Sequence, residues 1–173
     1  YNILKPIFIV GVPRCGSTLV EKIIGSGVKF VPMGEETGVI ENFINSKIYE
    51  NNSLNLGNDS DIRNILFKTY QNQGLISEKF DNTFTDKTLS NFFYVNLIQK
   101  IFPNAKIINC KRNAISSIVS IFQNNLIDIT WAHDLDDIFK YFDNYFKIIE
   151  NFEKKNPNFI YNLQFEKLVN SPV

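Results

Sequence analysis

The segment PIFIVGVPRCGSTLVEKII, residues 6–24, decides the fold of this chain. Its first half holds a short apolar run, Ile7–Val12, which predicts a buried strand. Its second half, Thr18–Ile24, reads as a helix that starts directly on a glycine-containing loop. A strand that runs through such a loop straight into a helix is typical of a parallel α/β sheet.

The loop between this strand and helix carries groups suited to a phosphate. Amides at a helix N-terminus lack partners inside the helix, and the helix dipole favours a negative charge there. Gly16 permits close approach of the backbone, and Arg14 offers a planar fork of donors for phosphate oxygens. The residues that we expect to hold the phosphate are Arg14, Cys15, Gly16, Ser17 and Thr18.

The spacing of Gly11 and Gly16 is that of a Walker A loop, but Ser17 follows where such a loop has its lysine. That lysine would reach the β- and γ-phosphates of a nucleoside triphosphate. Its absence argues against ATP or GTP as the ligand.

The same alternation of strands and helices continues along the chain. The sequence predicts a parallel central sheet with helices on both faces, in one domain that spans residues 1–173. Residues 45–60 are polar and rich in asparagine, which predicts a loop or a lid. The further predicted strands are Lys106–Cys110 and Asn158–Leu163, and the further predicted helices are Leu89–Ile101, Ala114–Asn124 and Asp134–Phe152.

A second basic junction follows the strand Lys106–Cys110. Arg112 stands where this strand ends, and Ser120 lies eight residues further on, a little over two helical turns. The carboxyl ends of parallel strands open onto one crevice. Arg112 and Ser120 are therefore predicted to hold a second phosphate beside the first loop.

Bulk composition limits the classes of partner and compartment. The formal net charge is zero, so the chain has no general field to attract a nucleic acid. Cys15 and Cys110 form neither a disulfide-dense nor a zinc-spaced pattern, which favours a reducing, cytoplasmic location. No apolar run approaches the roughly 20 residues of a membrane span. The ends of the sequence look like those of a piece of a longer chain.

Several motifs in order resemble the PAPS-dependent sulfotransferase superfamily. The likeness is greatest to the protein-tyrosine sulfotransferases and to the bacterial sulfotransferases that follow tetratricopeptide repeats, which implies such repeats as neighbours in the full-length protein. The stretches that carry the resemblance are residues 6–23, Met33–Thr37, Thr85–Lys87, Ile101–Lys106, Cys110–Ser120, His133–Asp137 and Gln164–Pro172.

The resemblance implies a PAPS donor, a hydroxyl acceptor and a role for each matching residue. Glu36, or its neighbour Glu35, would be the catalytic base, and Lys87 would stabilise the leaving phosphate. Arg14 and the loop around it would hold the 5′-phosphosulfate, and Arg112 with Ser120 the 3′-phosphate. The acceptor stays open among a peptide tyrosine, a sugar, a lipid headgroup and another small molecule.

The sequence also departs from the family pattern at three places. Phe165 replaces a tyrosine that often lies near the adenine, and Gly38 replaces the arginine that follows the G-E-E-T motif of tyrosine sulfotransferases. The segment that usually closes over the nucleotide would follow Val173. His133, the only histidine, matches no catalytic position of the family.

Two other functions compete with this hypothesis. A magnesium-dependent P-loop nucleotide kinase builds its phosphate loop in the same way, but it needs a Walker lysine. No acidic residue ends the strand Lys106–Cys110, where such a kinase would hold magnesium, so we expect a reaction without metal. A non-catalytic module that binds a nucleotide or a partner protein is the second alternative.

Overall fold

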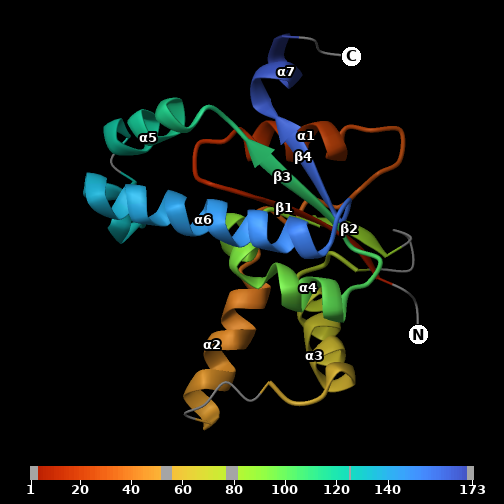
Figure 1. Cartoon of the computed structure of the whole chain (residues 1–173). Coiled ribbons are helices and arrows are strands. Elements are labelled where there is room, and N and C mark those ends of the chain that lie inside the picture. The colour runs from red at the N-terminus through yellow and green to blue at the C-terminus, as the bar shows by residue number, and fades with distance from the viewer. Residues whose placement is uncertain (1–3, 52–55, 77–81, 125, 171–173) are drawn as a thin grey trace.

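A computed structural model of the chain describes residues 4–51, 56–76, 82–124 and 126–170. Four parallel strands form the central sheet in the order β2-β1-β3-β4. Helices flank this sheet, and α6 runs along it in Figure 1. The strands are β1 (Lys5–Gly11), β2 (Thr83–Asp86), β3 (Lys106–Lys111) and β4 (Ile160–Gln164).

The predicted α/β class and parallel sheet are confirmed, and most helices lie where their apolar spacing indicated. The helix predicted over Leu89–Ile101 is divided, because its first half is a 3-10 helix, η2. The helical elements are α1 (Ser17–Gly25), α2 (Val39–Asn51), α3 (Asp59–Asn72), η2 (Leu89–Tyr94), α4 (Val95–Ile101), α5 (Ala114–Gln123), η3 (Thr130–His133), α6 (Leu135–Lys155) and α7 (Phe165–Asn170).

The predicted loop or lid over residues 45–60 is wrong for most of its described part. Helix α2 continues to Asn51 and α3 begins at Asp59, while residues 52–55 lie outside the described ranges. The two helices extend together away from the sheet (Figure 1). Helix α2 forms because Ile40 and Phe43 are buried against the core, which offsets the poor helix propensity of its asparagines.

Aromatic side chains fill much of the core under the sheet. Phe8 of β1 packs against Phe102 with 5.9 Å between ring centroids, and Tyr70 of α3 packs against Phe84 of β2 at 4.7 Å. All four side chains are buried. Burial of a large aromatic side chain stabilises a fold by about 1.5–3 kcal/mol. These contacts tie β1, β2 and α3 into one rigid support for the loops above them.

The strand register places the predicted site residues at one edge of the sheet. Phe8 pairs with Asp86, and Gly11 pairs with Cys110. Both loops predicted to hold phosphate, and the segment that carries Lys87, therefore leave the sheet at its carboxyl edge. Among the described residues, no helix is both long and apolar enough to cross a membrane.

Candidate active site

The loop after β1 adopts a conformation that only particular residues allow. Gly16 precedes α1 with φ of 93°, and a Cβ atom there would lie 2.3 Å from the ring of Phe165. Both the backbone angle and the close packing require glycine at this position. Arg14 also has a positive φ, 68°, so the turn carries backbone strain. Ser17 and Thr18, in the first turn of α1, face the cavity described below.

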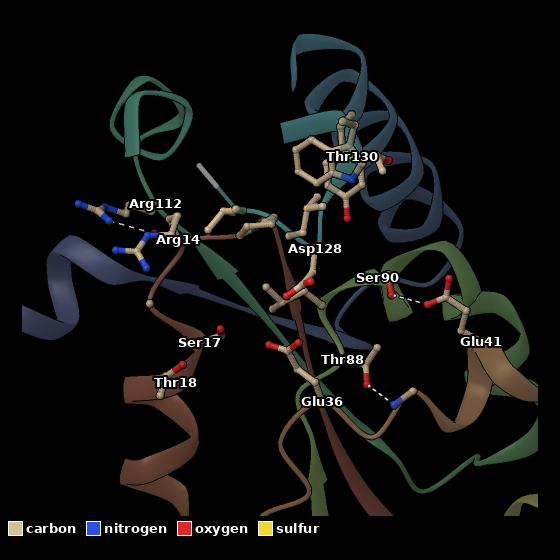
Figure 2. Close-up of a pocket in the computed structure, with 18 residues that line it drawn as sticks. Arg14, Ser17, Thr18, Glu36, Glu41, Thr88, Ser90, Arg112, Asp128 and Thr130 are labelled. Atoms are coloured by element: carbon tan, nitrogen blue, oxygen red, sulfur yellow. Dashed lines mark hydrogen bonds between the residues drawn. The ribbon is translucent and has the colours of Figure 1, made fainter. Parts of the chain in front are cut away.

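The two basic loops meet directly. The Arg14 Nε donates a hydrogen bond to Ser120 Oγ at 3.0 Å, and the Arg112 Nη1 donates to the Arg14 carbonyl oxygen at 2.9 Å. The Arg112 guanidinium also lies over the Phe165 ring, 5.2 Å from its centroid. Residues far apart in the sequence therefore form one cluster, of which Arg14 and Arg112 are seen at the left of Figure 2.

The start of α5, beside Arg112, is fixed by two polar side chains. Asn113 caps the helix by accepting a hydrogen bond from the Ser116 amide at 3.0 Å. Glu166 of α7 accepts a hydrogen bond from the Asn113 amide at 2.8 Å, and this bond is the main cause of a lowered pKa of the Glu166 carboxyl. Asn113 and Glu166 thus hold the segment that directly follows Arg112.

The two candidate bases are placed differently. Glu36 lines the cavity, and its Oε1 accepts from Lys87 Nζ at 3.3 Å. Glu35 is not among the residues that line the cavity. The Lys87 side chain is 8% exposed and the Glu36 side chain is 71% exposed, so a buried ammonium meets a solvated carboxylate. Figure 2 shows Glu36 pointing into the space opposite Arg14.

A buried carboxylate supports the segment that carries Lys87. Asp86 accepts hydrogen bonds from Tyr70 Oη at 2.7 Å and from Thr37 Oγ1 at 2.7 Å. It also accepts from the Thr88 amide at 3.0 Å. Burial is the main cause that raises the pKa of Tyr70 well above its usual value, and the charge of Asp86 adds to it. This network fixes the start of α2 against the end of β2.

Cys15 does not take the position expected of a phosphate ligand. Its side chain is 1% exposed, it does not line the cavity, and its amide donates to the Val12 carbonyl oxygen at 3.3 Å. Its thiol lies against that of Cys110, and a hydrogen bond from Cys110 is the main cause of a lowered pKa of Cys15. The same contact raises the pKa of Cys110. Both cysteines are free.

The cavity itself measures about 830 Å³ and opens between the cluster around Arg14 and Arg112 and the segment that carries Glu36. Trp131 and Tyr141 stack in its wall with 3.8 Å between ring centroids and 13° between ring planes. Of the predicted residues it is lined by Arg14, Gly16, Ser17, Thr18, Glu36 and Arg112. Lys87 and Ser120 are joined to it through their hydrogen bonds to Glu36 and Arg14.

Most of the other residues that line the cavity belong to no motif. Glu41, which accepts from Ser90 Oγ at 3.1 Å, faces the cavity from the first turns of α2. Asp128 precedes η3 and Thr130 begins it, in a segment without a recognisable motif (Figure 2). Pro13 and Gly38, which lie in or beside the matching motifs, also line the cavity. The residues of the lining that motifs did not single out also include Thr88, Leu89, Ser90, Leu126, Ile129, Trp131 and Tyr141.

The family comparison agrees with this arrangement. The model of a family described as the sulfotransferase family matches residues 6–173. This chain belongs to the sulfotransferase family. In the part of this sulfotransferase that the structure describes, no group of three or more His, Cys, Asp or Glu side chains could hold a metal ion.

One curated relative is similar over nearly the whole chain. It is an uncharacterized protein of Aquifex aeolicus (strain VF5), 30% identical over 181 residues. The match covers 97% of this chain but 24% of that protein, so the chain spans about a quarter of its relative's length.

Solved structures of sulfotransferases share the fold. A sulfotransferase domain from the curacin biosynthetic pathway superposes with a TM-score of 0.65 at 18% identity, over 99% of this chain and 71% of that one. A sulfotransferase of Mycobacterium tuberculosis H37Rv gives a TM-score of 0.63 at 12% identity, over 98% and 64%. A sulfotransferase of Alicyclobacillus acidocaldarius gives 0.60 at 16% identity, over 98% and 77%.

Proposed function

We propose that this chain binds PAPS in the cavity and transfers its sulfuryl group to a hydroxyl acceptor. The observation that carries the proposal is the contact between Arg14, in the loop after β1, and Ser120 of α5, because the sequence assigns these residues to different phosphates. A nucleoside monophosphate needs one anion site, whereas PAPS carries charge at both its 5′ and 3′ positions. Membership of the sulfotransferase family supports the same donor.

The residues present fit such a donor chemically. The first turn of α1 and Arg14 would hold the 5′-phosphosulfate, and Arg112 with Ser120 would hold the 3′-phosphate. All of these groups are donors or cations. Arg14, Ser17, Thr18 and Arg112 gather on one side of the cavity (Figure 2), and Ser120 bonds to Arg14. Adenosine 3′,5′-bisphosphate is the leaving group of the reaction. The negative charge that develops on its 5′-phosphate leaves with it.

The transfer step needs a base for the acceptor hydroxyl and a cation for the leaving phosphate. Glu36 takes the proton of the acceptor hydroxyl, because its carboxylate faces the cavity and is open to solvent. The acceptor oxygen then forms a bond to sulfur while the bond from sulfur to the bridging phosphate oxygen breaks. Lys87, 3.3 Å from Glu36, neutralises charge that develops on the leaving phosphate.

Titration calorimetry with adenosine 3′,5′-bisphosphate and with ATP tests the nucleotide class. We expect binding of the bisphosphate without any divalent cation. Magnesium-dependent binding of ATP in its place would favour a nucleotide kinase and contradict the proposal.

Transfer is tested with ³⁵S-labelled PAPS and three probes, namely a tyrosine-containing peptide, methyl glucoside and 4-nitrophenol. Label on any of the three supports an enzyme and identifies the acceptor class. Tight bisphosphate binding without transfer to any of them, in the full-length protein as well, would favour the non-catalytic module.

A further inference from the structure

Glu21 of α1 is a residue that no motif singled out. It carries a carboxyl group and is 2% exposed. Among the described residues, no lysine, arginine or histidine forms an ion pair with it. Removal of a carboxyl group from water costs free energy unless hydrogen bonds compensate it, so its place in the core calls for specific partners.

All the recorded hydrogen bonds of Glu21 go to the segments that carry the proposed base and lysine. Its Oε1 accepts from the Glu35 amide at 3.0 Å and from Thr85 Oγ1 at 2.6 Å. The Thr85 hydroxyl in turn accepts from the Gly34 amide at 3.2 Å. One oxygen atom therefore links the helix of the phosphate loop to the turn before Glu36 and to the end of β2.

The turn that Glu21 holds is strained. Glu35 has φ of 52°, in the left-handed region that costs a residue with a side chain roughly 1–2 kcal/mol. Its backbone is clamped at both ends, because the Glu35 carbonyl oxygen also accepts from the Lys87 amide at 2.7 Å. Such conformations persist where the surrounding structure fixes them, and this one directs Glu36 into the cavity beside Lys87.

We propose that Glu21 is a positioning residue, which uses one buried carboxylate oxygen to hold the Glu35–Glu36 turn and the end of β2 in register with the phosphate loop. It touches no reacting atom. Its effect reaches the reaction through Glu36 and Lys87, so the proposal rests on the proposed function of that pair. The donor site and the base are thereby set at a fixed separation by a single side chain of α1.

The test compares Glu21→Met, which removes the acceptor, with Glu21→Gln, which keeps an acceptor oxygen of the same reach. We expect Glu21→Met to lower kcat by about 10- to 100-fold, because small displacements of a catalytic group have effects of that size. Affinity for adenosine 3′,5′-bisphosphate should change less than about twofold, and Glu21→Gln should recover most of kcat. Ile62→Val, a core substitution in α3, controls for general loss of stability.

Amide hydrogen exchange gives a second measurement that needs no turnover. The Glu35 amide should exchange at least about tenfold faster in Glu21→Met, while the amides of Leu19 and Val20 in α1 keep their wild-type rates. Thr85→Val replaces the bridging hydroxyl by a methyl group, while the Gly34 amide keeps its bond to the Thr85 carbonyl oxygen at 3.1 Å. It should accelerate exchange at Glu35, because Glu21 loses one of its two donors, and it serves as the milder variant if Glu21→Met does not fold.

The outcomes separate the two proposals. An unchanged kcat and an unchanged exchange rate at Glu35 in Glu21→Met would overturn the positioning role alone. A loss of bisphosphate affinity equal to the loss of kcat would also overturn it, because α1 itself would then be disturbed. A wild-type protein that binds the bisphosphate but transfers no label would overturn the proposed function, and the positioning role in catalysis with it.

Discussion

At the scale of single residues, the structure separates two neighbouring glutamates, of which the sequence favoured Glu36 as the base with Glu35 as the alternative. Glu36 faces the cavity and meets Lys87, whereas Glu35 is held through its backbone. We expect Glu36→Gln to lower kcat by about 100-fold or more, the usual contribution of a general base, without weakening bisphosphate binding. Glu35→Gln, the matched control, should stay within a few-fold of wild type in the same labelled-PAPS assay. The reverse ranking would assign the base to Glu35.

Gly16 illustrates how one missing side chain shapes the phosphate loop. Gly16→Ala combines a positive φ of 93° with a contact of 2.3 Å to Phe165, so we expect a loss of about 2 kcal/mol or more in the free energy of unfolding. Gly74→Ala, where φ is 77° and no atom lies within 4 Å of the new Cβ, carries only the backbone strain of about 1 kcal/mol. Urea denaturation of both variants measures the difference. Equal losses would show that the packing against Phe165 is not the deciding factor.

At the scale of elements, the loops after β1 and β3 divide the predicted nucleotide between them. We expect Arg112→Ala to weaken binding of adenosine 3′,5′-bisphosphate by about 10- to 100-fold, because a hydrogen bond to a charged group contributes about 1.5–3 kcal/mol. Its effect on AMP, which lacks the 3′-phosphate, should be small. Calorimetry with both nucleotides measures this, and Lys106→Ala, at the opposite end of β3, removes the same charge far from the site. Equal weakening for both nucleotides would contradict the division.

Elements with a clear pattern of apolar residues were predictable from the sequence, and an element without such a pattern was not. The strands β1 and β3 are bounded apolar runs, and the long helix α6 shows its buried stripe in Ile138, Phe142 and Ile149. Strand β2 was not foreseen as a strand, because Thr83–Asp86 is short and ends in an acidic residue. Asp86 is buried only because Tyr70 and Thr37, distant in sequence, bond to it.

Helix α5 shows that helical spacing alone does not identify the buried face. Ile115, Ile118, Val119 and Phe122 recur at helical spacing, as they would on one apolar face. Three of them are 72%, 45% and 48% exposed (Ile115, Val119 and Phe122), and Ile118 is only partly buried. Ser117 and Ile121 are the buried residues of α5. The motif residues that line the cavity have a signal in the sequence, whereas Asp128, Thr130 and Glu41 reach the cavity only through tertiary packing.

At the scale of the whole molecule, a chain with zero net charge places Arg14, Arg112 and Lys87 at one edge of its sheet. Zero net charge gives no long-range attraction, so ligand binding must act through the local cluster around Arg14 and Arg112. That cluster joins β1, β3 and α5, and Arg112 lies over Phe165 of α7. A nucleotide bound there should therefore stabilise the folded chain as a unit and not one loop alone.

Thermal denaturation measures that coupling. At 100 times its dissociation constant, a ligand that binds only the folded state adds about 2.7 kcal/mol to the free energy of unfolding. For a domain of this size, 1 kcal/mol shifts the midpoint by about 2–4 °C, so adenosine 3′,5′-bisphosphate should raise Tm by roughly 5–10 °C. The rise should be the same in EDTA and in magnesium, because the proposed donors are arginines, hydroxyls and amides. A rise that requires magnesium, or a larger rise with magnesium and ATP, would show that the two loops form a triphosphate site instead.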